Sequence, residues 1–439
     1  MRGEIFNKNN LLVLLILISI FSFFFGFYFE ENSAGGGKAD FNNTWRNLQM
    51  FESNDLFTAL SLTASNDSNV FQSSRIPGVY IFHKLFNPFT ENIFQFKLSV
   101  TLLSLLVPIF FYKALTLRFQ KVEKINLALI SCLLLLSPYF RTSAFWGNEE
   151  NFGLLSLILS YIFLKKYLST NERNFEISYL IFLGFFSSLC VYFDQKLAFI
   201  PIVCLLMILK SQKESFDKII LIIIYTIMSF PILYLFYLWG SILPPIDASG
   251  RGMSLYSYNF QHIGYVSSII FFYLLPFFLS DISQFKNLFD IKIKNNRLFF
   301  LTSFIFILYF LFFHDLNKEL SFGNGVFFKL SSIFFTNQIY QKILLSLIFI
   351  ISFFVLFNIL KKDFYNYFIF IFLVFASIIY KPVLQEYFDP LIIILIFTFV
   401  LTRFSFKSSS LIISYFYFLS FLIFSNFYYY KLCLTSPFC

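Results

Sequence analysis

Long apolar runs recur along almost the whole chain, and they constrain its fold more than any other feature. A helix needs about 20 apolar residues to cross the hydrocarbon core of a bilayer. The first run covers Leu11 to Tyr28, and twelve more begin near Leu98, Ile125, Phe152, Ile177, Leu197, Ile219, Tyr265, Leu298, Ile343, Phe364, Leu391 and Leu411. These runs predict an all-α fold, a polytopic transmembrane helix bundle of about 13 spans.

The composition excludes the other broad classes of protein. Of the 439 residues, 58% are hydrophobic and only 13% are charged, whereas soluble domains carry about 25% charged residues. Intrinsically disordered chains are poor in apolar residues, so they are excluded as well. We therefore expect a single integral membrane domain over residues 1–439, with a first anchor at 11–28, a long extracytoplasmic loop at 29–96 and the remaining bundle at 97–439. The first run is too long and apolar for a cleaved signal peptide.

The orientation follows from the positive charges in the short connections. Lys and Arg concentrate in cytoplasmic loops of membrane proteins, and here they cluster at residues 118–124, 165–176, 210–218, 286–297, 361–362 and 403–407. The net charge of +9 is thus explained by topology, and no nucleic-acid partner is expected. The prediction is a multi-pass protein of a bacterial inner (plasma) membrane, whose active site faces the periplasm or exterior.

The first outer loop holds the leading candidate for a catalytic base. Three glycines, Gly35 to Gly37, precede Asp40, and the apolar residues Phe41, Trp45 and Leu48 follow it at helical spacing. This pattern predicts amphipathic interfacial helices. Asp40 is either the N-cap of such a helix or a carboxylate placed just above the membrane for catalysis, and both roles are compatible.

A second block of the same loop suggests a binding site for a phosphate. Arg75 stands before Ile76, Pro77 and a turn-forming Gly, and His83 follows. The planar guanidinium fork of Arg binds two phosphate oxygens at once. The plainer alternative is that Arg75 contacts a lipid headgroup.

The third outer segment, Ser137 to Asn151, packs an Arg and two carboxylates into a short hairpin between two spans. Charges close to the bilayer are costly and are often functional. We therefore take Arg141 as a candidate for substrate binding, and Glu149 and Glu150 as candidates for catalysis. Simple solvation of the loop is the alternative.

Two further outer segments are short and polar. Asp194 and Lys196 lie in a minimal connection between spans, where they either bind substrate or neutralise each other. Gln385 and Tyr387 lie in a late outer segment that ends at Pro390. We include all four as candidates for substrate binding.

No sequence motif identifies a metal or a nucleotide. The chain has no Walker A loop, no HExxH, no dinucleotide fingerprint and no DxD. The five cysteines form no ligand set, although Cys433 and Cys439 are able to pair in an oxidising compartment. No metal site is predicted, no cofactor is required, and dependence on a divalent metal stays open.

The order of these features resembles the GT-C superfamily of polytopic glycosyltransferases, which includes bacterial relatives of the protein O-mannosyltransferases and lipopolysaccharide sugar transferases. The resemblance rests on the N-terminal anchor, Asp40 in the long first loop, the Arg75–Pro77 block, the Ser137–Asn151 hairpin and the Gln385–Pro390 segment. It implies an inverting transfer of a sugar from a polyprenyl-phosphate donor to a lipid, glycan or protein acceptor, with Asp40 as base. Family members often carry a second acid near the first, whereas Phe41 and Asn42 follow Asp40 here.

Other function classes stay open beside this one. A transporter or flippase for lipid-linked oligosaccharides usually shows internal repeats and broken helices, and this chain shows no repeat. A polymerase or ligase usually has its largest outer loop late in the chain, whereas here it comes first. A non-catalytic membrane subunit is the remaining alternative.

Overall fold

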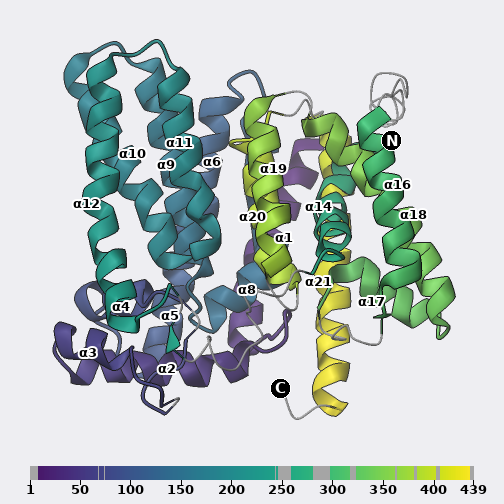
Figure 1. Cartoon of the computed structure of the whole chain (residues 1–439), viewed down its shortest axis with the longest axis horizontal. Helices are drawn as coiled ribbons and strands as arrows, with labels where there is room; N and C mark the ends of the chain where they lie inside the picture. The colour runs from purple at the N-terminus through teal and green to yellow at the C-terminus, as the bar shows by residue number, and fades with distance from the viewer. Residues whose placement is uncertain are drawn as a thin grey trace, which may run out of the picture. The chain divides into compact units, whose positions relative to one another are not determined.

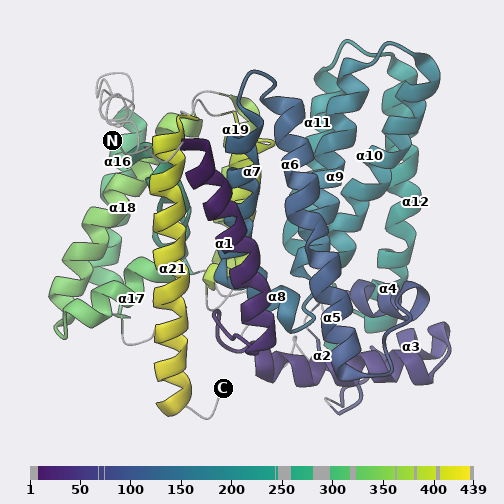
Figure 2. The ribbon, with the colours of Figure 1, turned by 180° about the vertical axis from the view of Figure 1, so that it is seen from behind.

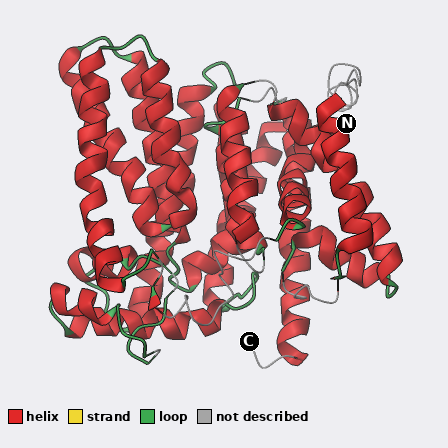
Figure 3. Cartoon of the chain, in the orientation of Figure 1, coloured by secondary structure: helices red, strands yellow, loops and turns green. Residues whose placement is uncertain are grey.

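A computed structural model describes residues 8–67, 69–73, 75–242, 244–245, 259–279, 297–316, 323–360, 363–379, 383–401 and 406–435. Within these residues the regular structure is entirely helical (Figure 3), which confirms the predicted all-α class. The chain forms two compact units, one comprising Met1–Arg251 with Phe418–Cys439 and the other Gly252–Tyr417. The single domain predicted over residues 1–439 stays a prediction.

The helices confirm a polytopic membrane protein but give fewer spans than the sequence predicted. Within the described residues, eight helices are long and apolar enough to cross a bilayer, and a ninth span results if the bent pair Lys124–Leu136 and Pro138–Phe145 counts as one. The eight are Asn9–Tyr28, Ile93–Arg118, Glu150–Ser169, Arg173–Phe193, Ser215–Trp239, His262–Leu279, Gln338–Ile359 and Ser408–Lys431.

The other four of the 13 predicted spans correspond to shorter helices. These are α11 (Phe199–Lys210), α16 (Arg297–Phe313), α19 (Phe364–Ala376) and α20 (Leu391–Phe397). When a turn occupies part of an apolar run, the run predicts a longer helix than the structure contains. α11, for example, begins only after the 3₁₀ turn η2 (Gln195–Ala198), and α20 has only 7 residues.

In the first unit, one set of helices runs side by side and three others lie across one end (Figures 1 and 2). The helices that run side by side include α1 (Lys8–Tyr28), α5 (Ile93–Ser104), α6 (Leu106–Arg118), α9 (Glu150–Ser169), α10 (Arg173–Phe193) and α12 (Ser215–Trp239). The helices that lie across are α2 (Gly37–Ser53), α3 (Leu56–Leu62) and α4 (Gly78–Phe86), all from the predicted first outer loop. α7 (Lys124–Cys132), the 3₁₀ turn η1 (Leu133–Leu136) and α8 (Pro138–Phe145) form the bent pair.

The two ends of this unit collect the segments that the sequence assigned to opposite sides. At one end, Trp239 of α12 donates to the Thr63 hydroxyl in the first loop at 3.0 Å. At the other end, Lys213 donates to the Thr170 carbonyl at 2.5 Å, and Arg173 pairs with Asp217 at 2.6 Å. The second end carries the basic connections, which the sequence predicts to face the cytoplasm.

Helix α2 has the amphipathic pattern that the sequence predicted. Its buried side chains include Phe41, Thr44, Leu48 and Phe51, at intervals of three or four residues. Its N-cap, however, is Gly36, so Asp40 lies in the first turn and the predicted capping role of Asp40 is wrong. Gly36 has φ 69°, a left-handed conformation that glycine adopts without a steric penalty.

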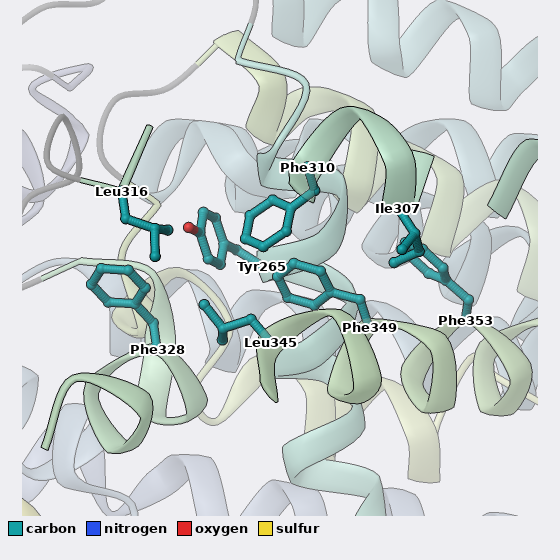
Figure 4. Close-up of a cluster of buried hydrophobic side chains, with 8 residues drawn as sticks. All are labelled: Tyr265, Ile307, Phe310, Leu316, Phe328, Leu345, Phe349 and Phe353. Atoms are coloured by element: carbon teal, nitrogen blue, oxygen red, sulfur yellow. The ribbon is translucent and has the colours of Figure 1, made fainter. Parts of the chain in front are cut away.

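The second unit packs around a cluster of buried, mainly aromatic side chains (Figure 4). It contains α14 (His262–Leu279), α16, α17 (Gly325–Phe334), α18 (Gln338–Leu360), α19, the 3₁₀ turns η5 (Ser377–Ile379) and η6 (Gln385–Tyr387), α20 and the start of α21 (Ser408–Thr435). Tyr265 of α14 lies among Phe310, Phe328 and Phe349, with ring centroids 5.5–6.1 Å apart and nearly perpendicular planes. Such edge-to-face contacts stabilise aromatic cores beyond simple burial.

Candidate functional site

Arg75 lies between two carboxylates in the first unit. Its Nη1 is 3.1 Å from Oε1 of Glu149, and its Nη2 is 2.7 Å from Oε1 of Glu150. Asp194 acts on Arg75 through its charge, and Lys196 acts on Glu150 in the same way. The structure thus brings together five of the ten predicted site residues, which we call the Arg75 cluster: Arg75, Glu149, Glu150, Asp194 and Lys196.

The packing on both sides of Arg75 sets its position. Ile76, the next residue, is buried and packs with Leu235 and Trp239 of α12. At Gly78, a Cβ atom would lie 2.4 Å from the Tyr192 carbonyl oxygen, so only glycine permits this approach to the end of α10. Packing therefore sets the path of this segment and holds the guanidinium at the ends of α10 and α12.

The two glutamates stand where the α8 hairpin turns into α9. Carboxylates are favourable at the N-terminus of a helix, because the helix dipole is positive there. The Ser143 hydroxyl donates to Oε2 of Glu150 at 3.1 Å. Sequence reasoning missed Ser143, because a serine in a polar hairpin carries no signal of its own.

Asp194 and Lys196 approach the same place from the α10–η2 connection. Lys196 Nζ lies 3.3 Å from Oδ2 of Asp194, so the two partly neutralise each other, which was one of the two predicted roles. A Cβ atom on Gly153 of α9 would lie 2.9 Å from Cβ of Asp194, so this glycine lets the connection approach α9 closely. The Arg75 cluster has two cationic and three anionic side chains, a net charge of −1.

Burial and neighbouring charges determine how the cluster titrates. Burial by itself would lower the pKa of Arg75, but the carboxylates of Glu149, Glu150 and Asp194 raise that pKa well above its usual value. Burial raises the pKa of Glu149, and the Arg75 charge opposes this shift only in part. A carboxyl group with a raised pKa is suited to accept a proton.

His83 lies beside the cluster as a buried neutral ring. It packs edge-on against Phe96 and Phe152, with centroids 4.9 and 5.4 Å away, and its Nδ1 lies 3.0 Å from the Asn87 amide. Burial lowers the pKa of His83 to about 3. The imidazole is therefore uncharged at neutral pH, and its predicted part in substrate binding stays a prediction.

Arg141 lies apart from these contacts, in a pair of its own. It is 1% exposed, and its Nε donates to Oε1 of Glu31 at 2.8 Å, while Nη2 contacts the other oxygen of the same carboxylate. Ser22 and the Leu135 carbonyl take the remaining donors at 2.7–3.1 Å. The structure explains its burial as an anchor between α8 and the end of α1, and its predicted role in substrate binding stays untested.

The sequence interpretation missed a second cation, which lies in the first turns of the candidate span Ile93–Arg118. Lys97 of α5 is paired with Glu30 at 2.9 Å, and its Nζ lies 4.1 Å from the centroid of a Trp146 ring. A cation over an aromatic face is attracted to it. The sequence signal for it is a lone Lys in the first turns of an apolar run.

The other predicted residues lie elsewhere. Asp40 is exposed in the first turn of α2. Gln385 and Tyr387 belong to the second unit, where the buried Gln385 side chain donates to the Tyr273 hydroxyl at 2.9 Å and accepts from the Val326 amide at 2.9 Å. The structure therefore places Gln385 in a satisfied hydrogen-bond network of η6, α14 and α17.

Metal-ligating residues do not gather in the part of the chain that the structure describes, where no group of three or more His, Cys, Asp or Glu side chains is suited to hold an ion. Cys132, Cys190 and Cys204 are free thiols, whereas Cys433 and Cys439, whose pairing the sequence left open, lie outside the described side chains. Comparison with protein families, curated proteins and solved structures gives no match for this chain.

Proposed function

We propose that this membrane protein is an inverting glycosyltransferase, which moves a sugar from a polyprenyl-phosphate donor to a lipid, glycan or protein acceptor on the extracytoplasmic face. The observation that carries the proposal is the Arg75 cluster. It combines a guanidinium, a lysine and partly buried carboxylates at the end of the unit opposite the basic connections. The cluster lies at the ends of the candidate membrane spans Glu150–Ser169 and Arg173–Phe193, so we expect a lipid-linked donor to reach it from the bilayer.

The chemistry requires one proton acceptor and one stabiliser of negative charge. A carboxylate takes the proton from the acceptor hydroxyl, whose oxygen forms the new bond to the anomeric carbon. The bond from that carbon to the phosphate oxygen breaks, and its electron pair leaves with the lipid phosphate. Arg75 and Lys196 are placed to stabilise the charge that develops there. A single displacement of this kind inverts the anomeric centre.

Two carboxylates compete for the role of base. Glu149 is 8% exposed and lies beside Arg75, and its raised pKa suits proton transfer. Asp40 is exposed on α2, which suits an acceptor that arrives from outside. We favour Glu149 because the base and the charge stabiliser must act on the same sugar, and we keep Asp40 as the alternative.

A transfer assay tests the proposal. Purified protein in lipid nanodiscs is incubated with a panel of radiolabelled polyprenyl-phosphate sugars and with membrane lipid or glycan acceptors. General-base assistance contributes roughly 10²–10⁴-fold in rate, so Glu149→Gln should slow transfer by about that factor. Arg75→Lys should also be poor, because Lys lacks the fork that binds two oxygens.

The controls separate the two bases and the competing function classes. Asp55→Asn removes an exposed carboxylate from the same loop and keeps a good cap for α3, so it should transfer at the wild-type rate. If Asp40→Asn is inactive and Glu149→Gln is not, the base is on α2. If no sugar is transferred but the labelled lipid crosses the bilayer, the protein is a flippase, and the proposal is wrong.

A further inference from the structure

The two glutamates of the Arg75 cluster hold the guanidinium in different ways. Nη2 makes a hydrogen bond to Glu150 at 2.7 Å, and the Ser143 hydroxyl supports the same carboxylate. Nη1 lies 3.1 Å from Glu149, but it has no aligned hydrogen bond although it is buried. Glu150 therefore orients Arg75, while Glu149 is held mainly by charge.

A buried donor without an aligned acceptor is costly, so Nη1 is poised to bind a better acceptor. A phosphate oxygen is such an acceptor, since Arg–phosphate hydrogen bonds are short and charge-assisted. The Arg75 side chain as a whole is 22% exposed, but Nη1 itself is buried, so a ligand reaches this nitrogen only when Glu149 moves away. A phosphate at Nη1 and the Glu149 carboxylate are both anions, and they repel each other at this distance.

We propose that Glu149 occupies, in the ligand-free protein, the position on Arg75 that the donor phosphate takes, so that donor binding displaces Glu149 and frees it to act as the base. This inference rests on the proposed function. It makes Glu149 a stronger base once a donor is bound, because in the ligand-free protein the Arg75 charge lowers the pKa of Glu149 and opposes the effect of burial. Glu150 keeps Arg75 in place during the exchange.

The charged and titratable groups that face Glu149 determine how phosphate binding depends on pH. Arg75 faces it from the segment before α4, Tyr80 from α4, Glu150 from α9, and Asp194 from the α10–η2 connection, while Lys196 faces Glu150. His83 of α4 is neutral above about pH 3 because burial lowers its pKa to about 3. Because burial raises the pKa of Glu149, lowering the pH should protonate this carboxylate, remove the competing anion and strengthen phosphate binding.

Binding of a lipid phosphodiester tests the inference without any turnover. The probe is a polyprenyl methyl phosphodiester, which has one negative charge throughout the range from pH 4.5 to pH 8, and the measurement is its Kd for the full chain in nanodiscs. We expect Glu149→Gln to bind the probe ~10-fold more tightly than the wild type at pH 7.5, which corresponds to about 1.4 kcal/mol. Asp55→Asn, the charge-matched control, should keep the wild-type Kd.

Glu150→Gln and the pH profile complete the test. Glu150→Gln should not tighten binding, because it removes the carboxylate that orients Arg75. The wild-type Kd should fall as the pH is lowered, and Glu149→Gln should lose this dependence. An unchanged Kd for Glu149→Gln, or equal tightening by both Gln variants, overturns the inference and leaves the proposed function standing. If the wild type does not bind the probe at any pH, a phosphate-linked donor is excluded and the proposed function fails as well.

Discussion

At the scale of single residues, the buried charges of the first unit divide into two kinds. All five N–H groups of Arg141 have acceptors within the protein, and the paired Glu31 also accepts from Asn426 at 3.4 Å. Arg75, by contrast, keeps a donor without an aligned acceptor. A guanidinium whose donors are all hydrogen-bonded within the protein stabilises the fold, whereas one with a donor lacking an acceptor is able to bind a ligand. We therefore interpret Arg141 as structural and Arg75 as ligand-binding.

The pair of Arg141 and Glu31 should be a main source of stability. Glu31→Gln keeps the shape of the side chain but leaves the Arg141 charge buried without a counterion. Removal of one partner of a buried pair costs about 3–5 kcal/mol, and we expect a loss of this size in thermal or denaturant unfolding in detergent. Asp67→Asn, at an exposed loop position, should change little. The double variant Glu31→Gln, Arg141→Met should recover part of the loss, and a Glu31→Gln protein as stable as the wild type would show that the pair contributes nothing.

His83 should make the protein less stable in mild acid. Its pKa is about 3 in the folded state, against 6.5 for an exposed histidine. Below pH 6.5 the unfolded chain therefore takes up a proton that the folded chain does not, so stability falls as the pH drops from 6.5 towards 3 and is unaffected by this group above 6.5. The slope is at most about 1.4 kcal/mol per pH unit. Unfolding of His83→Gln, followed from pH 7.5 to pH 4.5, should lack this part of the slope; identical profiles for both proteins would refute the assignment.

At the scale of elements, α2 is held at both ends by specific groups. Its N-terminus follows a glycine turn, in which Gly35 and Gly36 have φ 71° and 69°. At its C-terminus the Lys84 ammonium of α4 donates to the carbonyls of Phe51 at 2.8 Å and Asn54 at 2.9 Å. Cations are favourable at a helix C-terminus, where carbonyls lack partners. These contacts fasten α2 to α4, which follows the Arg75 segment directly.

Removal of the Lys84 cap should loosen the end of α2 locally. Lys84→Met retains the aliphatic stem and loses hydrogen bonds to a charged donor, each worth about 1.5–3 kcal/mol. We expect faster amide hydrogen exchange in residues 50–56, while exchange in α9 and α10 stays as in the wild type. Lys84→Arg, which keeps a charged donor, is the matched control and should exchange slowly. Equal protection in Lys84→Met and wild type would mean that packing alone holds this helix end.

At the scale of the whole molecule, the sequence predicts well the features that follow from runs of apolar residues, and it predicts poorly the features that depend on contacts between distant residues. The all-α class and the membrane spans follow from apolar runs, and the buried face of α2 follows from the spacing of Phe41 and Leu48. Within the described residues only eight or nine of the 13 predicted spans are long enough to cross a bilayer, because turns such as η2 lie inside apolar runs. The pairing of Arg75 with Glu149 joins residues 74 positions apart, and no local pattern encodes it. Likewise, the N-cap of α2 is Gly36 and not Asp40. The left-handed backbone of Gly36 marks the start of the helix, and a residue pattern does not reveal such a conformation.

The two ends of the first unit should face opposite sides of the membrane. The first loop, the α8 hairpin and the α10–η2 connection share one end, and the basic connections share the other, so residues 67 and 172 should lie on opposite faces of the membrane. Both positions are exposed, and a cysteine can be placed at either in a variant whose five native cysteines are replaced by Ser or Ala. A membrane-impermeant maleimide applied to intact cells with a permeabilised outer layer should label Asp67→Cys and not Glu172→Cys. Glu172→Cys should react only after the inner membrane is opened.

Labelling of both cysteines from the same side would contradict the arrangement of the helices. The reverse pattern would leave that arrangement intact but turn the Arg75 cluster to the cytoplasm, where an extracytoplasmic transfer is ruled out.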